Sequence, residues 1–282
     1  MENKILVTGV NGQLGHDVVL ELQKRNIEAV GVDVTDFDIT DRNATEEFIK
    51  KEAVTGIIHC AAYTAVDKAE EEAELCRKIN VDGTKNLLDA AKKISAKFIF
   101  ISTDYVFGAD GENFLEPDDT KNPLNEYGRT KCEAEKIVAE YEKSFIVRTS
   151  WVFGINGNNF VKTMLRLSET KEELNVVCDQ TGSPTYTVDL AVLLSDMIAS
   201  EKYGVYHATN ENICSWAEFA EKIMQLAGAK TVINHIPTSE YKTAARRPLN
   251  SRLSKVCLDK NGFSRLPTWE NALGRYIVEF KK

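Results

Sequence analysis

Residues 5–15, with the sequence ILVTGVNGQLG, determine the fold that we expect for the rest of the chain. The stretch opens with three branched apolar residues, which predict a short buried strand. Glycines follow at three-residue spacing, at Gly9, Gly12 and Gly15. From Leu14 to Leu22 an apolar residue recurs every four positions, which indicates a helix. A strand, a glycine turn and a helix in this order are typical of a unit that binds a dinucleotide.

Each of the three glycines has its own role in such a turn. Gly9 permits the tight turn, Gly12 lets the backbone approach a pyrophosphate, and Gly15 lets the helix pack closely on the strand. The helix N-terminus would face the phosphate charge. The turn therefore predicts a dinucleotide cofactor.

Further apolar runs alternate with helical patterns as far as residue 149. These runs are residues 29–32, 56–62, 97–101 and 145–149. Such alternation is typical of an α/β fold with a Rossmann-type doubly wound parallel sheet. We predict a dinucleotide-binding domain over residues 1–154 and a smaller C-terminal α/β substrate domain over residues 155–282. A helix and a strand near 186–209 are expected to return to the sheet.

Other segments are expected to be simpler than the sheet. Residues 67–94 predict one long helical stretch, and the polar residues 111–123 predict a loop. Helices are expected near 160–167, 188–200 and 215–226, with an extended piece at 175–178. An arginine-rich loop is expected to complete the chain.

Composition limits the function classes. Across the 282 residues the net charge is −8, which argues against a nucleic-acid-binding surface but permits an anionic small substrate. The six cysteines contain no C-x-x-C pair and the four histidines have no metal-binding spacing, so we expect reduced thiols and no metal. No signal peptide or membrane-spanning run is evident. We expect a cytoplasmic monomer or homodimer that binds neither nucleic acid nor membrane.

Tyr127 and Lys131 are four residues apart, which places them on one helix face. A nearby ammonium favours the phenolate, so we expect the Tyr127 pKa to be lowered toward neutrality. Such a tyrosine can act as a general acid or base on an alcohol/ketone pair. Thr103, at the end of the apolar run 97–101, would join them where parallel strands bind ligands. The alternatives are a surface Tyr/Lys pair and a capping hydroxyl.

Asp33 ends the second apolar run, where an acidic residue commonly binds the adenosine ribose. A carboxylate there repels a 2′-phosphate, so we expect NADH, with NADPH as the alternative. A turn or helix-capping role remains open for Asp33 because its loop contains many Asp and Thr residues. By position, Asp38 and Ile39 flank the adenine. The small Ala61 and Ala62 would let the dinucleotide lie across a strand end.

Taken together, five motifs resemble the extended short-chain dehydrogenase/reductase superfamily. They are TGVNGQLG, HCAAYTAVD, STDYVFG, YGRTK and RTSWVFG. GNNFVKTMLRL, DQTGSPT, GVYHATN and RRPLNSRLS extend the resemblance through the C-terminal half. The chain is most similar to the reductases that complete dTDP-L-rhamnose synthesis. That similarity implies NAD(P)H-dependent reduction of the C4 ketone of a nucleotide-linked sugar.

The resemblance implies roles for single residues. Tyr127 matches the proton donor, Lys131 the lysine that holds the nicotinamide ribose, and Thr103 the active-site hydroxyl. The sugar-contacting positions match Val66, Asp104 and Trp151, and the cofactor-contacting segments match Gly12, Gln13, Leu14, Ala62, Tyr63 and Thr64. Arg246, Arg247 and Arg252 are candidates for binding the diphosphate or for domain packing.

Relatives with other activities differ at identifiable positions. The sugar-nucleotide dehydratases carry Asp-Glu after the threonine, whereas this chain has Asp104-Tyr105 and so lacks the eliminating acid/base. Epimerases share the Tyr/Lys pair and remain an alternative. So does a non-catalytic dinucleotide-binding regulatory subunit, such as that of methionine adenosyltransferase. Some reductases bridge dimers through glutamate-bound metal, but this chain has Asp17 and Val188 there and ends in lysines, so we predict no metal.

Overall fold

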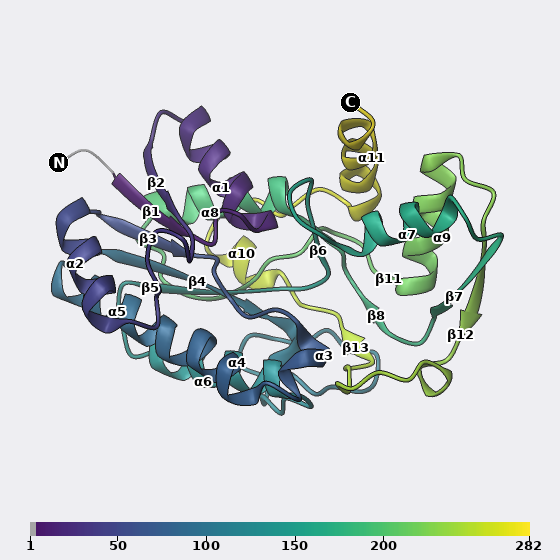
Figure 1. Cartoon of the computed structure of the whole chain (residues 1–282), viewed down its shortest axis with the longest axis horizontal. Coiled ribbons are helices and arrows are strands. Elements are labelled where there is room, and N and C mark those ends of the chain that lie inside the picture. The colour runs from purple at the N-terminus through teal and green to yellow at the C-terminus, as the bar shows by residue number, and fades with distance from the viewer. Residues whose placement is uncertain (1–3) are drawn as a thin grey trace.

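A computed structural model describes residues 4–282 of the chain (Figure 1). Its centre is a sheet of six parallel strands in the order β10-β5-β4-β3-β1-β2. The strands are β1 (Lys4–Thr8), β2 (Glu28–Val32), β3 (Gly56–His59), β4 (Lys97–Thr103), β5 (Ser144–Thr149) and β10 (Gly204–His207). The strand order reverses between β1 and β3, which is where a doubly wound sheet binds its ligands. The predicted α/β class is confirmed.

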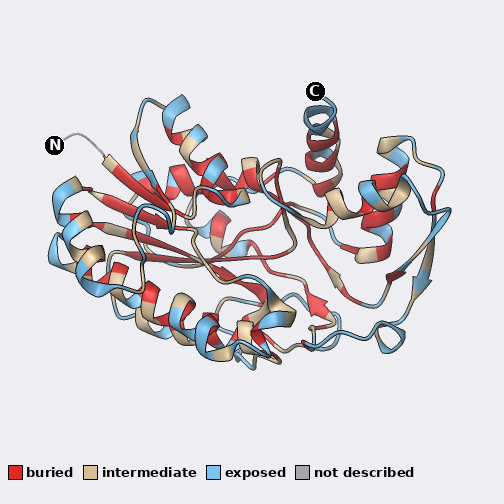
Figure 2. Cartoon of the chain, in the orientation of Figure 1, coloured by how far each residue is buried: buried red, intermediate tan, exposed pale blue. Residues whose placement is uncertain are grey.

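Helices cover both faces of this sheet (Figure 1). One face carries α1 (Gln13–Lys24), α8 (Thr187–Ala199) and the short α10 (Val256–Lys260). The other carries α2 (Arg42–Glu52), α5 (Thr84–Lys93) and α6 (Glu126–Val138). Successive strand residues point to opposite faces, so Ile5 and Val7 enter the first core and Leu6 the second. Both cores are the buried layers between sheet and helices in Figure 2.

The C-terminal part, whose elements are teal, green and yellow in Figure 1, has a core of its own. Its helices are α7 (Phe160–Ser168), α9 (Trp216–Ala227) and α11 (Trp269–Phe280). It contains three small sheets. In the first, β12 (Val232–Ile236) pairs with β7 (Glu173–Val177), and in the second β6 (Val152–Phe153) pairs with β9 (Thr185–Tyr186). In the third, β8 (Thr181–Gly182) lies between β11 (Cys214–Ser215) and β13 (Asn250–Ser251). Although α8 and β10 lie with the large sheet, the division at residue 154 stays a prediction.

A buried ion pair fastens α6 to the sheet. Arg148 of β5 donates from Nε and Nη2 to the two carboxylate oxygens of Glu135, both at 2.8 Å. The Ser102 hydroxyl of β4 donates to the same carboxylate at 2.6 Å. The Nη1 of Arg148 donates to the Pro117 carbonyl at 2.9 Å and lies 3.1 Å from His207 Nε2 of β10. Three strands, one helix and one loop therefore meet at this ion pair.

Two local predictions differ from the structure. The stretch 67–94 is helical as predicted except for a break at residues 70–72, between α3 (Val66–Ala69) and a continuous run of α4 (Ala73–Arg77), a π-helical turn (Lys78–Gly83) and α5. That turn buries Asn80, whose amide pairs with the backbone N–H and C=O of Tyr63 and donates to Thr130. The departure from regular α-helix at Lys78–Gly83 thus coincides with these tertiary hydrogen bonds.

The chain also ends in α11 rather than in an arginine-rich loop. Its N-cap is Thr268, whose hydroxyl accepts from the Asn271 N–H. Its buried side chains fall at helical spacing, at Trp269, Ala272, Leu273, Tyr276 and Ile277. The same spacing is visible in the sequence, so this helix is predictable in principle.

The glycine turn gives a test of how tightly α1 packs on the sheet. A Cβ on Gly15 would lie 2.3 Å from the Gly9 carbonyl oxygen, a backbone atom that cannot rotate away. We expect Gly15→Ala to lower the free energy of unfolding by roughly 1–3 kcal/mol. Denaturant unfolding of the purified protein measures this change.

The matched control is Gly274→Ala in α11, where a Cβ would meet nothing within 4 Å. That variant should be unchanged or stabilised by up to about 1 kcal/mol, because alanine favours a helix over glycine. Equal stability of the two variants would contradict the close helix–strand packing.

Candidate active site

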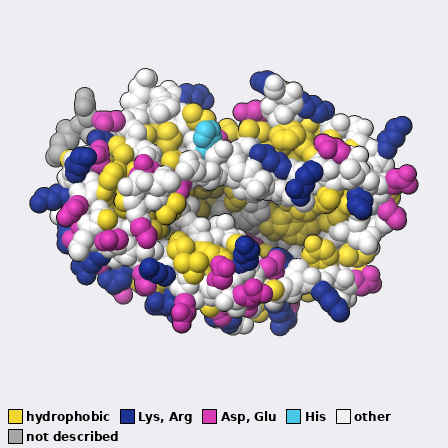
Figure 3. Space-filling model, in the orientation of Figure 1, with side chains coloured by type: hydrophobic (Ala, Val, Ile, Leu, Met, Phe, Trp, Pro, Cys, Tyr) yellow, Lys and Arg dark blue, Asp and Glu magenta, His cyan; other side chains and the backbone are white. Residues whose placement is uncertain are grey.

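A cavity of about 1030 Å³ runs along the carboxyl ends of the parallel strands. Figure 3 shows the surface hollowed between the two halves of the molecule, with hydrophobic side chains inside. Of the predicted site residues, those that line the cavity are Gly9, Gly12, Gln13, Leu14, Gly15, Asp33, Asp38, Ile39, Ala61, Ala62, Thr64, Val66, Thr103, Asp104, Tyr127, Lys131 and Trp151. Tyr63 is not among them, because its hydroxyl donates to Glu72 at 2.5 Å and its N–H donates to Asn80.

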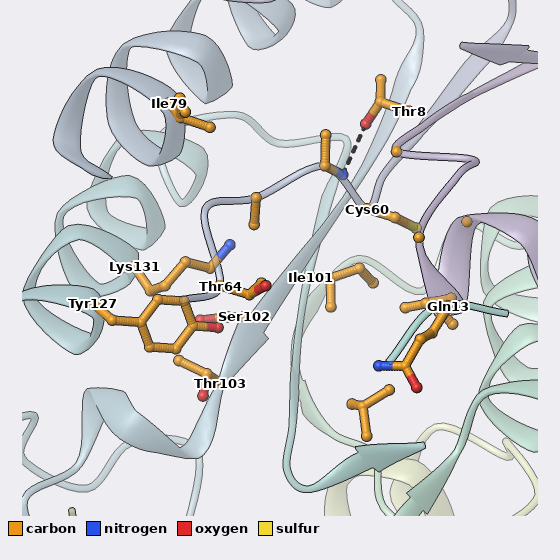
Figure 4. Close-up of a pocket in the computed structure, with 18 of the residues that line it drawn as sticks. Thr8, Gln13, Cys60, Thr64, Ile79, Ile101, Ser102, Thr103, Tyr127 and Lys131 are labelled. Atoms are coloured by element: carbon orange, nitrogen blue, oxygen red, sulfur yellow. Dashed lines mark hydrogen bonds between the residues drawn. The ribbon is translucent and has the colours of Figure 1, made fainter. Parts of the chain in front are cut away.

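The glycine turn has the shape of a cradle for a ligand. Gly9 has φ +73°, and a Cβ on it would lie 2.7 Å from the Ala61 backbone nitrogen. The Ala61 N–H donates to Thr8 Oγ1 at 3.2 Å, which holds the ends of β1 and β3 together (dashed line, Figure 4). Since a side chain at Gly9 would clash with this junction, the backbone alone borders the cavity there. These residues fit the pyrophosphate of a dinucleotide.

Asp33 has contacts that join the second strand to the glycine turn. Its carboxylate accepts from the backbone N–H groups of Asn11 at 3.0 Å and Val34 at 2.8 Å. The carboxylate oxygens can accept more than these two bonds, so the structural contacts leave capacity for a ribose hydroxyl. Phe37, Asp38 and Ile39 border the same end of the cavity.

Tyr127 and Lys131 both reach the cavity from α6. The helix begins after Asn125, whose side chain accepts from the Gly128 N–H at 2.8 Å. Figure 4 shows the two side chains extending toward the end of β4, where Ser102 and Thr103 lie. The two side chains therefore share one face of α6, as their four-residue spacing predicts.

The expectation for the Tyr127 pKa was wrong. Burial raises this pKa above its usual value, and the charge of Asp104 raises it further, while a hydrogen bond with Thr103 offsets part of the effect. The Lys131 ammonium lies 3.9 Å from the centre of the Phe100 ring, and burial lowers the Lys131 pKa to about 7. In the protein without ligands, burial is therefore the largest influence on the pKa of both groups.

Asp104 is a buried acid in the cavity, 2% exposed. Burial raises its pKa to about 6, against hydrogen bonds from Ser251 and Thr103 that lower it. Ser251 belongs to β13, so a residue from the C-terminal part contacts the end of β4. Sequence reasoning did not identify Ser251, and a serine within a two-residue strand leaves no periodic signal.

Trp216 was also missed. It opens α9, lines the cavity, and stacks on Trp151 with ring centres 3.9 Å apart and an interplanar angle of 15°. Trp151 has φ +50°, an uncommon conformation for a bulky residue, and a Cβ on Gly182 would lie 3.2 Å from its ring. Stacking and close packing thus hold the Trp151 indole in one orientation.

The loop 154–159 crosses from the C-terminal part to the glycine turn. The Gln13 side-chain oxygen accepts from the Gly154 N–H at 2.9 Å and from the Asn159 amide at 3.0 Å. The Asn156 amide donates to the carbonyls of Asn11 and Gly12 at 2.9 and 3.1 Å. The loop therefore fixes the shape of the turn from outside.

None of the three candidate arginines lines the cavity. Arg247 donates to the Asp67 carboxylate at 2.6 Å, and Arg252 donates to the Gly111 carbonyl and the Asn250 side chain. The carbonyl of Arg246 accepts from Asn125, while its side chain is exposed. Arg247 and Arg252 thus make packing contacts between distant segments.

Three further findings concern metal, thiols and membranes. Within residues 4–282, no three His, Cys, Asp or Glu side chains are arranged to hold a metal ion. Asp17 is buried and accepts a hydrogen bond from the Thr187 hydroxyl. The six cysteines are free thiols. No helix in the described part of the chain has the length and apolar character needed to cross a membrane.

Known proteins resemble this chain over nearly its whole length. The family model described as RmlD substrate binding domain matches residues 3–282. The spore coat polysaccharide biosynthesis protein SpsK of Bacillus subtilis is 39% identical, covering 98% of this chain and 97% of its own. The dTDP-4-dehydrorhamnose reductase of Escherichia coli is 38% identical with the same coverage.

A solved structure agrees with these matches. The dTDP-4-dehydrorhamnose reductase of Bacillus anthracis, in complex with NADP, is 42% identical and superposes with a TM-score of 0.96. The match covers 99% of this chain and 100% of that one. From its sequence, its fold and the strand-end cavity, the chain belongs to the RmlD family of dTDP-4-dehydrorhamnose reductases.

Proposed function

We propose that this protein reduces the C4 ketone of dTDP-4-dehydro-L-rhamnose to give dTDP-L-rhamnose, with NADH or NADPH as the reductant, in the cytoplasm. The observation that carries the proposal is one continuous cavity, bordered at one end by the glycine turn and at the other by Thr103, Tyr127 and Lys131. The family membership supports the substrate.

Bound NAD(P)H would supply the hydride. Gly9, Gly12 and Gly15 would hold its pyrophosphate, and Lys131 would hold the nicotinamide ribose. A lysine that loses its proton near pH 7 is charged only below that pH, so we expect ribose binding by the ammonium to weaken as the pH rises.

Tyr127 would supply the proton. Reduction of a ketone places negative charge on its oxygen, and this charge is neutralised by a proton from a group that is still protonated when the substrate binds. The raised pKa of Tyr127 keeps its hydroxyl protonated throughout the neutral range. Thr103, which lies beside Tyr127 at the end of β4 (Figure 4), would orient the ketone and stabilise the developing oxyanion.

Tyr105 in place of a glutamate supports reduction without elimination. Its ring packs edge-on against Tyr127, with ring centres 5.8 Å apart, and burial raises its pKa above the usual value. A phenol that stays protonated cannot act as the base that removes a proton from the sugar. The site therefore favours simple reduction over dehydration.

Tyr127→Phe tests the proton donor. We expect kcat to fall by roughly 10²–10⁴-fold, because positioned proton transfer contributes about that much. NADH affinity should remain, since the ring and the fold are kept. Oxidation of NADH at 340 nm with dTDP-4-dehydro-L-rhamnose measures the rate, and cofactor fluorescence measures binding.

Tyr105→Phe is the matched control, because it removes a neighbouring phenol that has no role in proton transfer. Its rate should stay close to that of the unmodified protein. Near-normal reduction by Tyr127→Phe would refute the mechanism. An unmodified protein that binds NADH tightly but never oxidises it with this sugar would instead indicate a non-catalytic regulatory subunit.

Asp33→Asn tests the preference for NADH. The amide keeps an oxygen to accept from Asn11 or Val34 but removes the charge that repels a 2′-phosphate. We expect the ratio of kcat/KM for NADH to that for NADPH to fall by roughly tenfold. Asp36→Asn should leave the ratio unchanged, because Asp36 does not line the cavity and the amide keeps an oxygen to accept from the Asp33 N–H. A ratio equally insensitive to both changes would argue against the ribose role of Asp33.

A further inference from the structure

The carboxylate of Asp104 is held by hydroxyls from two parts of the chain. Ser251 Oγ donates to Oδ2 at 2.5 Å, and Thr103 Oγ1 donates to Oδ1 at 3.0 Å. Thr103 is the neighbour of Asp104 in sequence, whereas Ser251 is 147 residues away. The longer connection links the end of β4, where the ketone would bind, to the C-terminal part.

Ser251 has little freedom to move away from this contact. It is 3% exposed and pairs with Gly182 in the parallel ladder of β13 and β8. A Cβ on Gly182 would lie 2.9 Å from the Ser251 Cβ, so the two backbones are closely packed. On the other side, the Asn250 amide donates to the Asn113 carbonyl at 2.8 Å. The Ser251 hydroxyl is therefore presented to Asp104 by a fixed backbone.

These contacts determine what Asp104 can offer to a ligand. An ionised carboxylate only accepts hydrogen bonds, and each of its oxygens can accept more than one. With one hydroxyl on each oxygen, Asp104 keeps acceptor capacity on the cavity side. A protonated Asp104 would instead place a hydrogen into the same contacts and compete with Ser251.

We propose that Ser251 is a positioning residue for the reduction. Its hydrogen bond keeps the Asp104 carboxyl group ionised and fixes its orientation, so that the carboxylate accepts a hydrogen bond from a sugar hydroxyl. The identity of the sugar rests on the function proposed above. The state of the Asp104 carboxyl is a property of the protein without ligands and can be measured separately.

The other titratable groups near Asp104 do not change their charge in the pH range in which the Asp104 carboxyl group titrates, apart from Lys131. Tyr105 and Tyr127 stay neutral, because burial raises the pKa of each phenol. Beyond Tyr105 lies the Arg247–Asp67 pair, in which the pKa of Asp67 is lowered by Arg247. The side chains of Thr103 and Ser251, which contact the Asp104 carboxylate directly, carry no charge.

Lys131 titrates in the same cavity but with the opposite consequence. Its pKa is lowered to about 7, so it loses its charge as the pH rises, which would give an alkaline limb in a rate profile. Asp104, with a pKa raised to about 6, loses its charge as the pH falls, which would give the acid limb. Removing the Ser251 hydrogen bond should move only the acid limb, and move it upward.

The first test is a ¹³C NMR titration of the aspartate carboxyl groups in the ligand-free protein. Asp104→Asn identifies the Asp104 signal. In Ser251→Ala we expect the Asp104 pKa to rise by about one unit, since a hydrogen bond to a charged group contributes about that much. Ser254→Ala is the matched control, a serine equally buried in the same segment that is not bonded to Asp104. An unchanged Asp104 titration in Ser251→Ala would overturn the proposal.

The second test is the pH profile of kcat/KM for sugar reduction. At pH 6, kcat/KM of Ser251→Ala should be about fivefold below that of the unmodified protein. At high pH this loss should disappear, so that Ser251→Ala and Ser254→Ala have the same kcat/KM relative to the unmodified protein. Recovery at high pH would also show that the variant is folded. An equal loss at every pH would mean a structural role only and would overturn the proposal. If the unmodified protein reduced no sugar at all, the proposed function would fail, while the NMR titration would still decide the effect of Ser251 on Asp104.

Discussion

The buried pair of Arg148 and Glu135 is the constraint on which the site depends. Glu135 lies one turn beyond Lys131 on α6, and its carboxylate also holds Ser102, which immediately precedes Thr103. Leaving either charge without its partner in the core typically costs about 3–5 kcal/mol, so the helix cannot slide along the sheet. His207 can share the guanidinium because burial and Arg148 lower its pKa to about 3 and keep it neutral. The distance between Tyr127 and the end of β4 is thus set outside the cavity.

Much of the large sheet could be predicted from sequence because its strands are continuous apolar runs and its helices have one apolar face. The π-helical turn within the segment 67–94 could not, since Asn80 is buried against the Tyr63 backbone and a helical pattern carries no information about that partner. The helix over residues 269–280 was predictable, because its buried side chains recur at helical spacing. The direction of the Tyr127 pKa shift could not be predicted either, because sequence spacing gives the neighbours of a side chain but not its burial.

The residues of the candidate site likewise fall into a group that the sequence predicts and a group that it does not. Residues at strand ends and in the glycine turn could be predicted to lie together, because parallel strands end at one edge of a sheet. Trp216 and Ser251 could not, because Trp216 lines the cavity from the first turn of a helix and Ser251 contacts Asp104 from a two-residue strand. Long-range pairing of such short elements has no periodicity, so a folded structure is needed to find the C-terminal side of the site.

The loop that carries Asn156 and Asn159 has a consequence for how such proteins can be recombined. Because Gln13 and the Gly12 carbonyl are bonded from about 140 positions further along the chain, the glycine turn is not an independent cassette. If the N-terminal half were exchanged between relatives, the new glycine turn would meet the loop 154–159 of the other parent. Chimeras within this family should therefore fold best when the glycine turn and the loop 154–159 come from the same parent.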